Sequence, residues 1–262
     1  MIAASSSRTQ PAYRPVGLPA RNTLGVILSI IMLVSVGCSA NSDQPPASVD
    51  DDGYPVTEMS FRSMPDGPPP ATFGTGPATL NTAPFRDAGA ALRVHGGLLT
   101  NSPAGPTGTA GYYTSANLGG PVRRIGARWV FLPRGTNGTD GAMALVVSQK
   151  AFDKPFPLHL VITPQNWWFG VWPPADAPGS KLEIVGGGPF ATPLRIDSGT
   201  EHTVDVTLSG QRATIVLPDG SVKYVRDARI AEWAGPYATF EVYAGKGSDD
   251  VGVGFSKIWA GA

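Results

Sequence analysis

Three of the chain's six tryptophans lie within six residues, in the segment PQNWWFGVWPP at 164–174. Side chains of a β-strand alternate between its two faces. This alternation groups Trp167 with Phe169 and Val171, which form the fuller apolar set. We expect this set to face the protein core.

The opposite face of this strand carries Trp168, Gly170 and Trp172. The two indoles would lie about 13 Å apart, with bare backbone at the glycine between them. Such a pair suits sugar stacking, because the C–H faces of a pyranose are apolar while its hydroxyls need polar partners. We predict a carbohydrate-binding surface made of the two indoles and nearby polar residues: Trp168, Trp172, Asn166, Gln165 and His159. The alternative is that both faces are buried, the second one by the proline-rich segment near residue 70.

The elements that would position this surface are β-strands. Short apolar alternations, separated by clusters of Gly, Pro, Asn and Asp, follow one another from about Leu92. RIGARWVFL at 124–132 predicts a strand with one apolar face, and 156–172 predicts a hairpin. Residues 202–226 predict a three-stranded antiparallel meander, with His202 at its start on the rim of the core. Since only 225–235 indicates a short helix, the pattern favours an all-β fold of two large sheets.

The charge distribution separates the N-terminus from the rest of the chain. The first 37 residues contain Arg8, Arg14 and Arg21 and no acidic residue. They are followed within this segment by an uncharged, mostly apolar run at 23–37, TLGVILSIIMLVSVG. This run suits the core of a signal peptide better than a membrane-spanning helix, which needs roughly 20 apolar residues.

The apolar run ends in LVSVGC, whose Cys38 is the only cysteine in the chain. This ending resembles a bacterial lipoprotein signal, in which small residues precede a cysteine that is lipidated and becomes the new N-terminus. The resemblance implies a lipid anchor on Cys38 that holds the protein to the cell membrane; an uncleaved signal anchor is the alternative. Both place later residues outside the cytoplasm, because the arginines stay inside. We expect a targeting segment at 1–37, a disordered tether at 38–57 and one domain at 58–262.

From Cys38 onward the chain has 17 basic and 20 acidic residues, a net charge of −3. A mildly acidic chain after Cys38 that has no basic run lacks the electrostatic footprint of a nucleic-acid-binding protein, so we exclude that class. A single cysteine cannot form an internal disulfide, and the domain must be stable through its core alone. We expect a monomer.

The order of the strand segments resembles a known fold family. FRSMPDGPPP opens the domain, and VHGGLLTNS, GYYTSANLGGPVRRIGARWVF and GTEHTVDVTLSGQRATIVLPDG follow. GPYATFEVYAGKGSDDVGVGFSKIWA closes it. Over about residues 60–260, this order is similar to the concanavalin A-like lectin and glucanase jelly roll, which includes laminin-G-like modules. The resemblance implies a two-sheet antiparallel jelly-roll sandwich that holds glycans on its concave sheet.

The chemistry known from this family is only partly present. Its glucanases carry Glu-x-Asp-x-(x)-Glu on one strand, whereas this chain contains no Glu-x-Asp. Glu201 and Asp205 share a strand, but at about 13 Å they are too far apart for a direct pair. Many lectin-like members bind calcium through an aspartate near the final strand, where this chain has Ser256. Asp249 and Asp250 remain the metal candidates, and no cofactor is expected.

These observations predict an exported cell-envelope protein that binds a carbohydrate or other envelope glycan without cleaving it. One alternative is a glycoside hydrolase or lyase acting on an envelope polysaccharide. The other is a protein-binding scaffold that uses the same aromatic surface. Two carboxylates within about 5–10 Å in a cleft would indicate the hydrolase.

Overall fold

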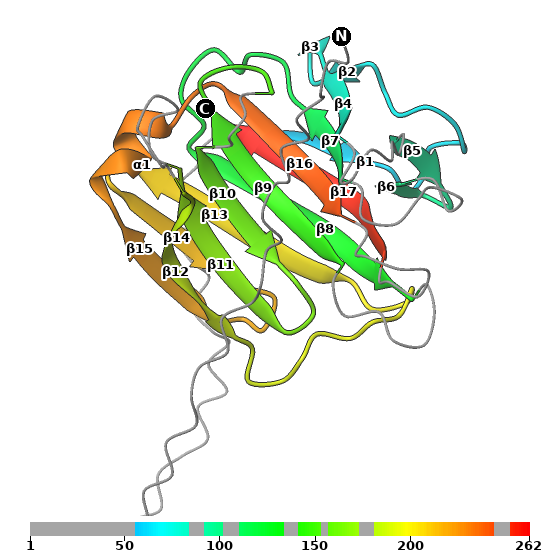
Figure 1. Cartoon of the computed structure of the whole chain (residues 1–262). Helices are drawn as coiled ribbons and strands as arrows, with labels where there is room; N and C mark the ends of the chain where they lie inside the picture. The colour runs from blue at the N-terminus through cyan, green and yellow to red at the C-terminus, as the bar shows by residue number, and fades with distance from the viewer. Residues whose placement is uncertain are drawn as a thin grey trace, which may run out of the picture. The chain divides into compact units, whose positions relative to one another are not determined.

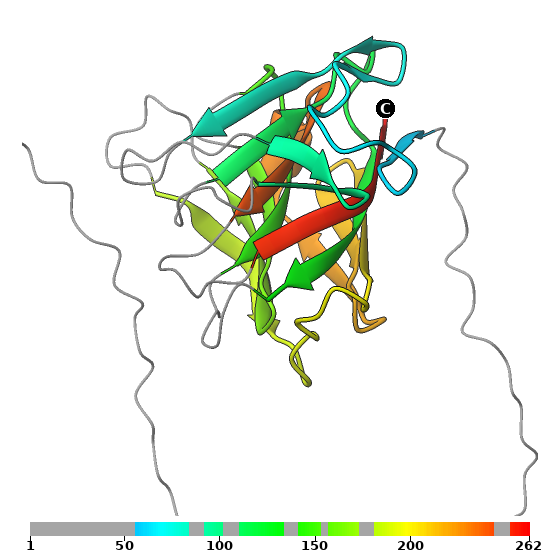
Figure 2. The ribbon, with the colours of Figure 1, turned by 90° about the vertical axis from the view of Figure 1, so that its right-hand side faces the viewer.

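The structure is a computed structural model that describes residues 56–83, 92–101, 110–133, 141–152, 157–172, 181–243 and 252–262. These residues all belong to one compact unit, 49–262. They form two large antiparallel sheets stacked face to face (Figure 1, Figure 2). The predictions for 1–37, Cys38, Asp249 and Asp250 concern residues outside the described ranges.

One described sheet has eight strands, in the order β15-β14-β13-β8-β17-β6-β5, and β1 also pairs with β17. Its strands are β1 (Thr57–Ser60), β5 (Leu92–His95), β6 (Leu98–Asn101), β8 (Arg124–Leu132), β13 (His202–Ser209), β14 (Arg212–Val216), β15 (Val222–Arg226) and β17 (Gly252–Gly261). The predicted meander is confirmed, because β13, β14 and β15 pair antiparallel in sequence order. β1 begins at Thr57, the last residue of the predicted tether.

The other sheet has seven described strands, in the order β12-β11-β10-β9-β16-β7-β4. Its strands are β4 (Thr79–Ala83), β7 (Ala110–Thr114), β9 (Ala142–Ser148), β10 (Leu158–Ile162), β11 (Asn166–Val171), β12 (Glu183–Pro189) and β16 (Tyr237–Tyr243). A small pair, β2 (Thr72–Phe73) and β3 (Gly76–Pro77), lies before them in the chain. The two-sheet antiparallel sandwich predicted from the sequence is confirmed.

Strand alternation accounts for the core between the sheets. The inward residues of β8 are Ile125, Ala127, Trp129 and Phe131, and all are buried in one continuous hydrophobic cluster with the inward residues of the other strands. β13 shows the same alternation of buried and more exposed residues. A strand buried on one face in this way has its register fixed, because a one-residue slip would turn its apolar set to solvent.

The proline-rich segment before β4 closes one end of this core. Phe73 is buried, with its ring centroid 6.5 Å from Tyr113 and 6.0 Å from Phe240. The Tyr113 hydroxyl donates a hydrogen bond to the carbonyl oxygen of Pro70 at 2.9 Å. These contacts lie on the inward side of the seven-stranded sheet, away from the face that was predicted to hold a sugar.

A short helix, α1 (Ala228–Trp233), follows β15, as the sequence predicts. It begins after Asp227, whose carboxylate accepts a hydrogen bond from the backbone N–H of Arg229. This is an N-cap, in which a side chain satisfies a backbone donor that the first helical turn leaves unpaired. No helix within the described ranges has the length and apolar character needed to cross a membrane.

Candidate functional site

The tryptophan-rich segment forms β11, which pairs antiparallel with β10 in the predicted hairpin. Trp167, Phe169 and Val171 are 6%, 3% and 0% exposed and belong to the main core. The prediction that this set faces inward is confirmed. Trp168 therefore lies on the outer face of the seven-stranded sheet.

Neither of the two remaining indoles stands free on that outer face. Trp168 is half-buried and packs against a small apolar cluster of Ala142, Ala144 and Val161. Trp172 follows the end of β11, is also half-buried, and donates its backbone N–H to the carbonyl of Pro157 at 3.0 Å. The outer face is thus a partly covered surface instead of an open shelf.

Gly170 does not leave bare backbone beside Trp168, and that prediction was wrong. A Cβ atom at this position would lie 2.6 Å from Cδ1 of Leu182 and 3.1 Å from Cζ3 of Trp168. Leu182 comes from the segment that leads into β12, so it cannot be anticipated from the hairpin alone. The glycine instead allows close packing of these two side chains.

His159 lies on β10 and connects Trp168 to the middle of the sheet. Its ring meets the Trp168 indole edge-on, with centroids 5.2 Å apart. On its other side, Nε2 of His159 lies 3.2 Å from Oε2 of Glu241 on β16. The strand between them, β9, places Ala144 opposite Glu241, and its small side chain leaves room for the longer ones to meet. The His159 and Glu241 side chains are only 14% and 11% exposed.

Tyr112 of β7 lies directly opposite Glu241 on the far side of β16. Burial raises the pKa of the Tyr112 hydroxyl, and the Glu241 carboxylate raises it further through its charge and a hydrogen bond. The phenol therefore stays protonated at neutral pH and can act as a hydrogen-bond donor. Trp168, His159, Glu241 and Tyr112 form a continuous line across the sheet, which we call the polar row.

The other two predicted residues lie at the hairpin turn. Asn166 is exposed, and its Oδ1 accepts a hydrogen bond from the Thr163 hydroxyl at 3.1 Å. Gln165 is half-buried, and its backbone carbonyl accepts from the N–H of Phe190. An open groove of about 540 Å³ along β11 and β12 is lined by residues that include Asn166 and Trp168. Trp168 therefore belongs to the polar row and also lines this groove.

The remaining acidic candidates have structural contacts. Asp205 accepts hydrogen bonds from Nε of Arg124 and from the Trp259 indole N–H, at 3.1 and 2.9 Å. Glu201 accepts a hydrogen bond from the Ser256 hydroxyl and pairs with Arg62. Burial acts to raise the pKa of Glu201, but its bonds with Ser256 and Arg62 outweigh burial and lower it. The Glu201 and Asp205 carboxylates thus have different partners and do not form a pair at one site.

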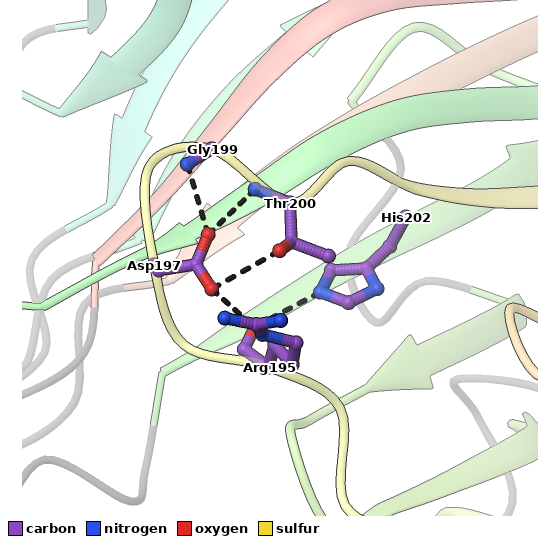
Figure 3. A network of polar contacts seen from close by, with 5 residues as sticks. All are labelled: Arg195, Asp197, Gly199, Thr200 and His202. Atoms are coloured by element: carbon purple, nitrogen blue, oxygen red, sulfur yellow. Dashed lines mark hydrogen bonds and ion pairs between the residues drawn. The ribbon is translucent and has the colours of Figure 1, made fainter.

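His202 lies at the start of β13 and on the rim of the core, as predicted. Its Nε2 lies 2.9 Å from the carbonyl oxygen of Arg195. Figure 3 shows the adjoining loop, in which the Asp197 carboxylate accepts hydrogen bonds from Gly199 and Thr200 and faces the Arg195 guanidinium. The Thr200 hydroxyl leads these contacts in lowering the pKa of Asp197. We interpret this network as structural: its hydrogen bonds fix the conformation of the loop that leads into β13.

The described residues contain no group of three or more His, Cys, Asp or Glu side chains arranged to hold a metal ion. The acidic member of the polar row was not singled out by the sequence. A signal was present: Glu241 interrupts the apolar strand YATFEVY, on the face opposite Phe240 and Val242. Tyr112 sits similarly beside the core residue Tyr113 in β7.

No protein-family model matches this sequence, and no curated protein does either. Solved structures do match. The metal-free exoplasmic/lumenal domain of VIP36 is 10% identical, with a TM-score of 0.51 over 78% of this chain and 91% of that one. The Emp47p carbohydrate recognition domain is 11% identical, with a TM-score of 0.50 over 78% of this chain and 94% of that one.

A third similar structure is the GH16 protein of a Bacteroides ovatus mixed linkage glucan PUL, solved in complex with a product. It is 12% identical, with a TM-score of 0.50 over 78% of this chain and 98% of that one. At such low identity these likenesses show the fold alone. The fold is that of a lectin-like jelly-roll sandwich, in agreement with the concanavalin A-like architecture expected from the sequence.

Proposed function

We propose that this chain is an exported, lipid-anchored cell-envelope protein whose sandwich domain binds a carbohydrate without cleaving it. The observation that carries the binding proposal is the polar row, in which an indole ring adjoins an imidazole, a carboxylate and a phenol on one outer sheet face. The ligand proposed is a glycan of the cell envelope.

The residue types of the polar row suit a sugar. The half-buried Trp168 ring, which packs on the cluster of Ala142, Ala144 and Val161, offers an apolar surface for a pyranose C–H face. Glu241 keeps carboxylate lone pairs that can accept hydrogen bonds from hydroxyls, and the Tyr112 oxygen can accept one while its proton bonds Glu241. Tyr112 and Glu241 are buried and His159 is nearly so, which strengthens each such bond, because the surrounding dielectric constant is lower than that of water.

The comparisons support this proposal only through the fold. One similar structure is named a carbohydrate recognition domain, and another is an exoplasmic/lumenal domain. A domain of this architecture on the outer side of a membrane is therefore consistent with the targeting segment predicted at 1–37. Lipidation of Cys38 rests on the LVSVGC ending alone.

A glycan-cleaving enzyme is the second candidate, and the contact between Glu241 and His159 favours it, because an acid and a base lie side by side. Against it, Glu241 is the only carboxylate that the described strands place on this face. Hydrolysis of a glycoside usually uses two. If the protein is an enzyme, Glu241→Gln will abolish the release of reducing ends from the polysaccharide that binds.

A fluorescence titration tests the binding proposal. The fragment 39–262 retains every described element, including Thr57 of β1, which pairs with Ala260 of β17. It should show saturable quenching with at least one envelope polysaccharide. Trp168→Ala and Glu241→Gln should each weaken binding at least 10-fold, on the scale of a lost charged hydrogen bond or aromatic contact.

Tyr224→Ala is the matched control, because Tyr224 is an exposed aromatic residue on the other sheet. It should leave the affinity unchanged. Unchanged affinity in both Trp168→Ala and Glu241→Gln, with the fold retained, would reject the polar row as the binding site.

A further inference from the structure

The outer face of the eight-stranded sheet carries a set of cations. Alternation directs them outward, because Ile125, Ala213 and Val225 on the same strands point into the core. The set, which we call the basic face, consists of Arg124 and Arg128 on β8, Arg212 on β14, Arg226 on β15 and Lys257 on β17. The described acidic residues on or beside this face are Glu58, Asp205 and Glu201, the last of which directly precedes β13, contacts Ser256 and interacts with Arg128. The basic face thus concentrates positive charge in a domain, 58–262, whose 17 basic and 16 acidic residues nearly balance.

The strand register pairs like charges directly across this face. Arg212 lies opposite Arg226, and Arg128 lies opposite Lys257. Like charges in directly opposed positions destabilise a sheet. Glu201 and Glu58 offset the pair of Arg128 and Lys257. The repulsion between Arg212 and Arg226 is not offset in this way, and a negatively charged partner over the face would relieve it.

The acidic residues of the face neutralise only part of this charge. Asp205 is engaged by Arg124, and Glu58 lies 2.6 Å from the Lys257 ammonium. Arg212 and Arg226 form no ion pair with any described residue. The guanidinium of Arg212 lies 5.9 Å from the ring centroid of Tyr224, which is 70% exposed.

We propose that the basic face docks the domain onto an anionic lipid bilayer. Its cations extend from β15 to β17, four strand spacings or about 19 Å. Such a breadth suits several headgroups at once better than one small anion. Threonine hydroxyls between the cations, at Thr203, Thr207 and Thr214, can bond phosphate oxygens. An exposed tyrosine beside arginine is typical of the membrane interface, where its ring and hydroxyl occupy the headgroup region.

This docking is independent of glycan binding and of lipidation. The polar row lies on the other sheet of the sandwich, so a domain resting on its basic face would keep the polar row turned away from the bilayer. A tether at Cys38 would add to the effect by raising the local concentration of the domain at the membrane.

Vesicle sedimentation tests the proposal with the fragment 39–262, which lacks the predicted targeting segment. Vesicles of phosphatidylcholine containing phosphatidylglycerol should bind the fragment, and vesicles of phosphatidylcholine alone should not. Salt should release it, because screening weakens exposed charge interactions. Arg212→Gln/Arg226→Gln should weaken binding about 30-fold, as expected for two cations at an anionic surface.

Lys150→Gln/Lys181→Gln is the matched control, since it removes two exposed cations near strands of the seven-stranded sheet. It should leave vesicle binding unchanged. A melting temperature at or above that of the parent would show that Arg212→Gln/Arg226→Gln folds. Equal binding to both kinds of vesicle, or an equal loss in the control, would overturn the proposal. So would binding to a soluble acidic polysaccharide without vesicle binding.

Discussion

Oε2 of Glu241 lies 3.2 Å from Nε2 of His159, although 82 residues and an intervening strand separate them. The contact matters because an unpaired carboxylate is costly to bury. The imidazole on one side and Tyr112 on the other satisfy it. The arrangement holds a polar group in a fixed position on a largely apolar face, which is what recognition of a hydroxylated ligand requires.

Removing Glu241 should therefore affect stability as well as binding. Glu241→Ala removes a hydrogen-bond partner of His159 and Tyr112. It should lower the free energy of unfolding by about 1–3 kcal/mol. Glu241→Gln keeps the shape and a hydrogen-bonding group, and it should cost less. Urea unfolding of the two variants measures the difference. Equal stability of Glu241→Ala and the parent would show that the carboxylate is not held by its neighbours.

The two adjacent tryptophans of β11 should respond differently to truncation. Trp167→Ala opens a cavity in the main core and should cost about 3–5 kcal/mol. Trp168→Ala removes a half-buried ring from a small satellite cluster and should cost clearly less. Denaturant midpoints compare them directly. A larger loss for Trp168→Ala would reverse the assignment of the two faces.

Gly126 should tolerate no side chain. A Cβ atom here would lie 2.3 Å from Cζ2 of Trp259, whose indole N–H donates to Asp205. Gly126→Ala should push the indole off the sheet, break that hydrogen bond and lower the melting temperature. Gly188→Ala is the control, because its Cβ would meet no atom within 4 Å. Equal melting temperatures for both variants would contradict the close packing of Trp259 on Gly126.

Asp227 should contribute stability that is lost in acid. Hydrogen bonding with the Arg229 side chain leads the effects that lower the pKa of Asp227 below its usual value of 3.8. The folded state thus favours the carboxylate, so the contribution is present above pH 3.8 and disappears as pH falls through the folded pKa. Asp227→Ala should cost about 1 kcal/mol at neutral pH and flatten the acid side of the stability curve.

Asp227→Asn controls for the helix cap, because asparagine also caps helices but cannot pair ionically with Arg229. Its stability should fall between those of the parent and Asp227→Ala. Chemical unfolding followed at several pH values provides the curves. If the stability of Asp227→Ala fell with decreasing pH as steeply as that of the parent, a group other than Asp227 would be responsible for the loss in acid.

The anchor can be examined on the full chain in a bacterial host. If Cys38 carries lipid, the mature protein will enter the detergent phase and its mass will show acyl chains on an N-terminal cysteine. Cys38→Ser should abolish both. A detergent-phase protein that still carries residues 1–37 would instead establish the alternative, an uncleaved signal anchor.

Much of the fold could be predicted because alternation is a local signal. Ile125 and Trp129, or Val204 and Val206, identify an inward face without knowledge of any other strand. The meander at 202–226 and the 156–172 hairpin were accessible for the same reason, since their turns are short and their strands are neighbours in sequence. The burial of Trp167 followed from the fuller apolar set on its face.

The site could be predicted only in part, because it depends on strand order. Tyr112, His159 and Glu241 meet only when β7, β16, β9 and β10 lie side by side, and no local pattern encodes that order. The sequence therefore singled out His159 and Trp168 as candidates but not Glu241, which lies on the strand next to the central one. The filling of the space at Gly170 by Leu182 was missed for the same reason.

The most direct measurement of the central claim is a two-dimensional NMR titration of the indole N–H signals, using the fragment 39–262 and the polysaccharide that quenches its fluorescence. The chain has six tryptophans, and single Trp→Phe variants assign their signals. Binding at the polar row should shift the Trp168 signal in a saturable manner, while the buried Trp129 and the opposite-face Trp259 stay unchanged. Shifts at Trp259 with none at Trp168 would contradict a glycan site on the outer face of the seven-stranded sheet.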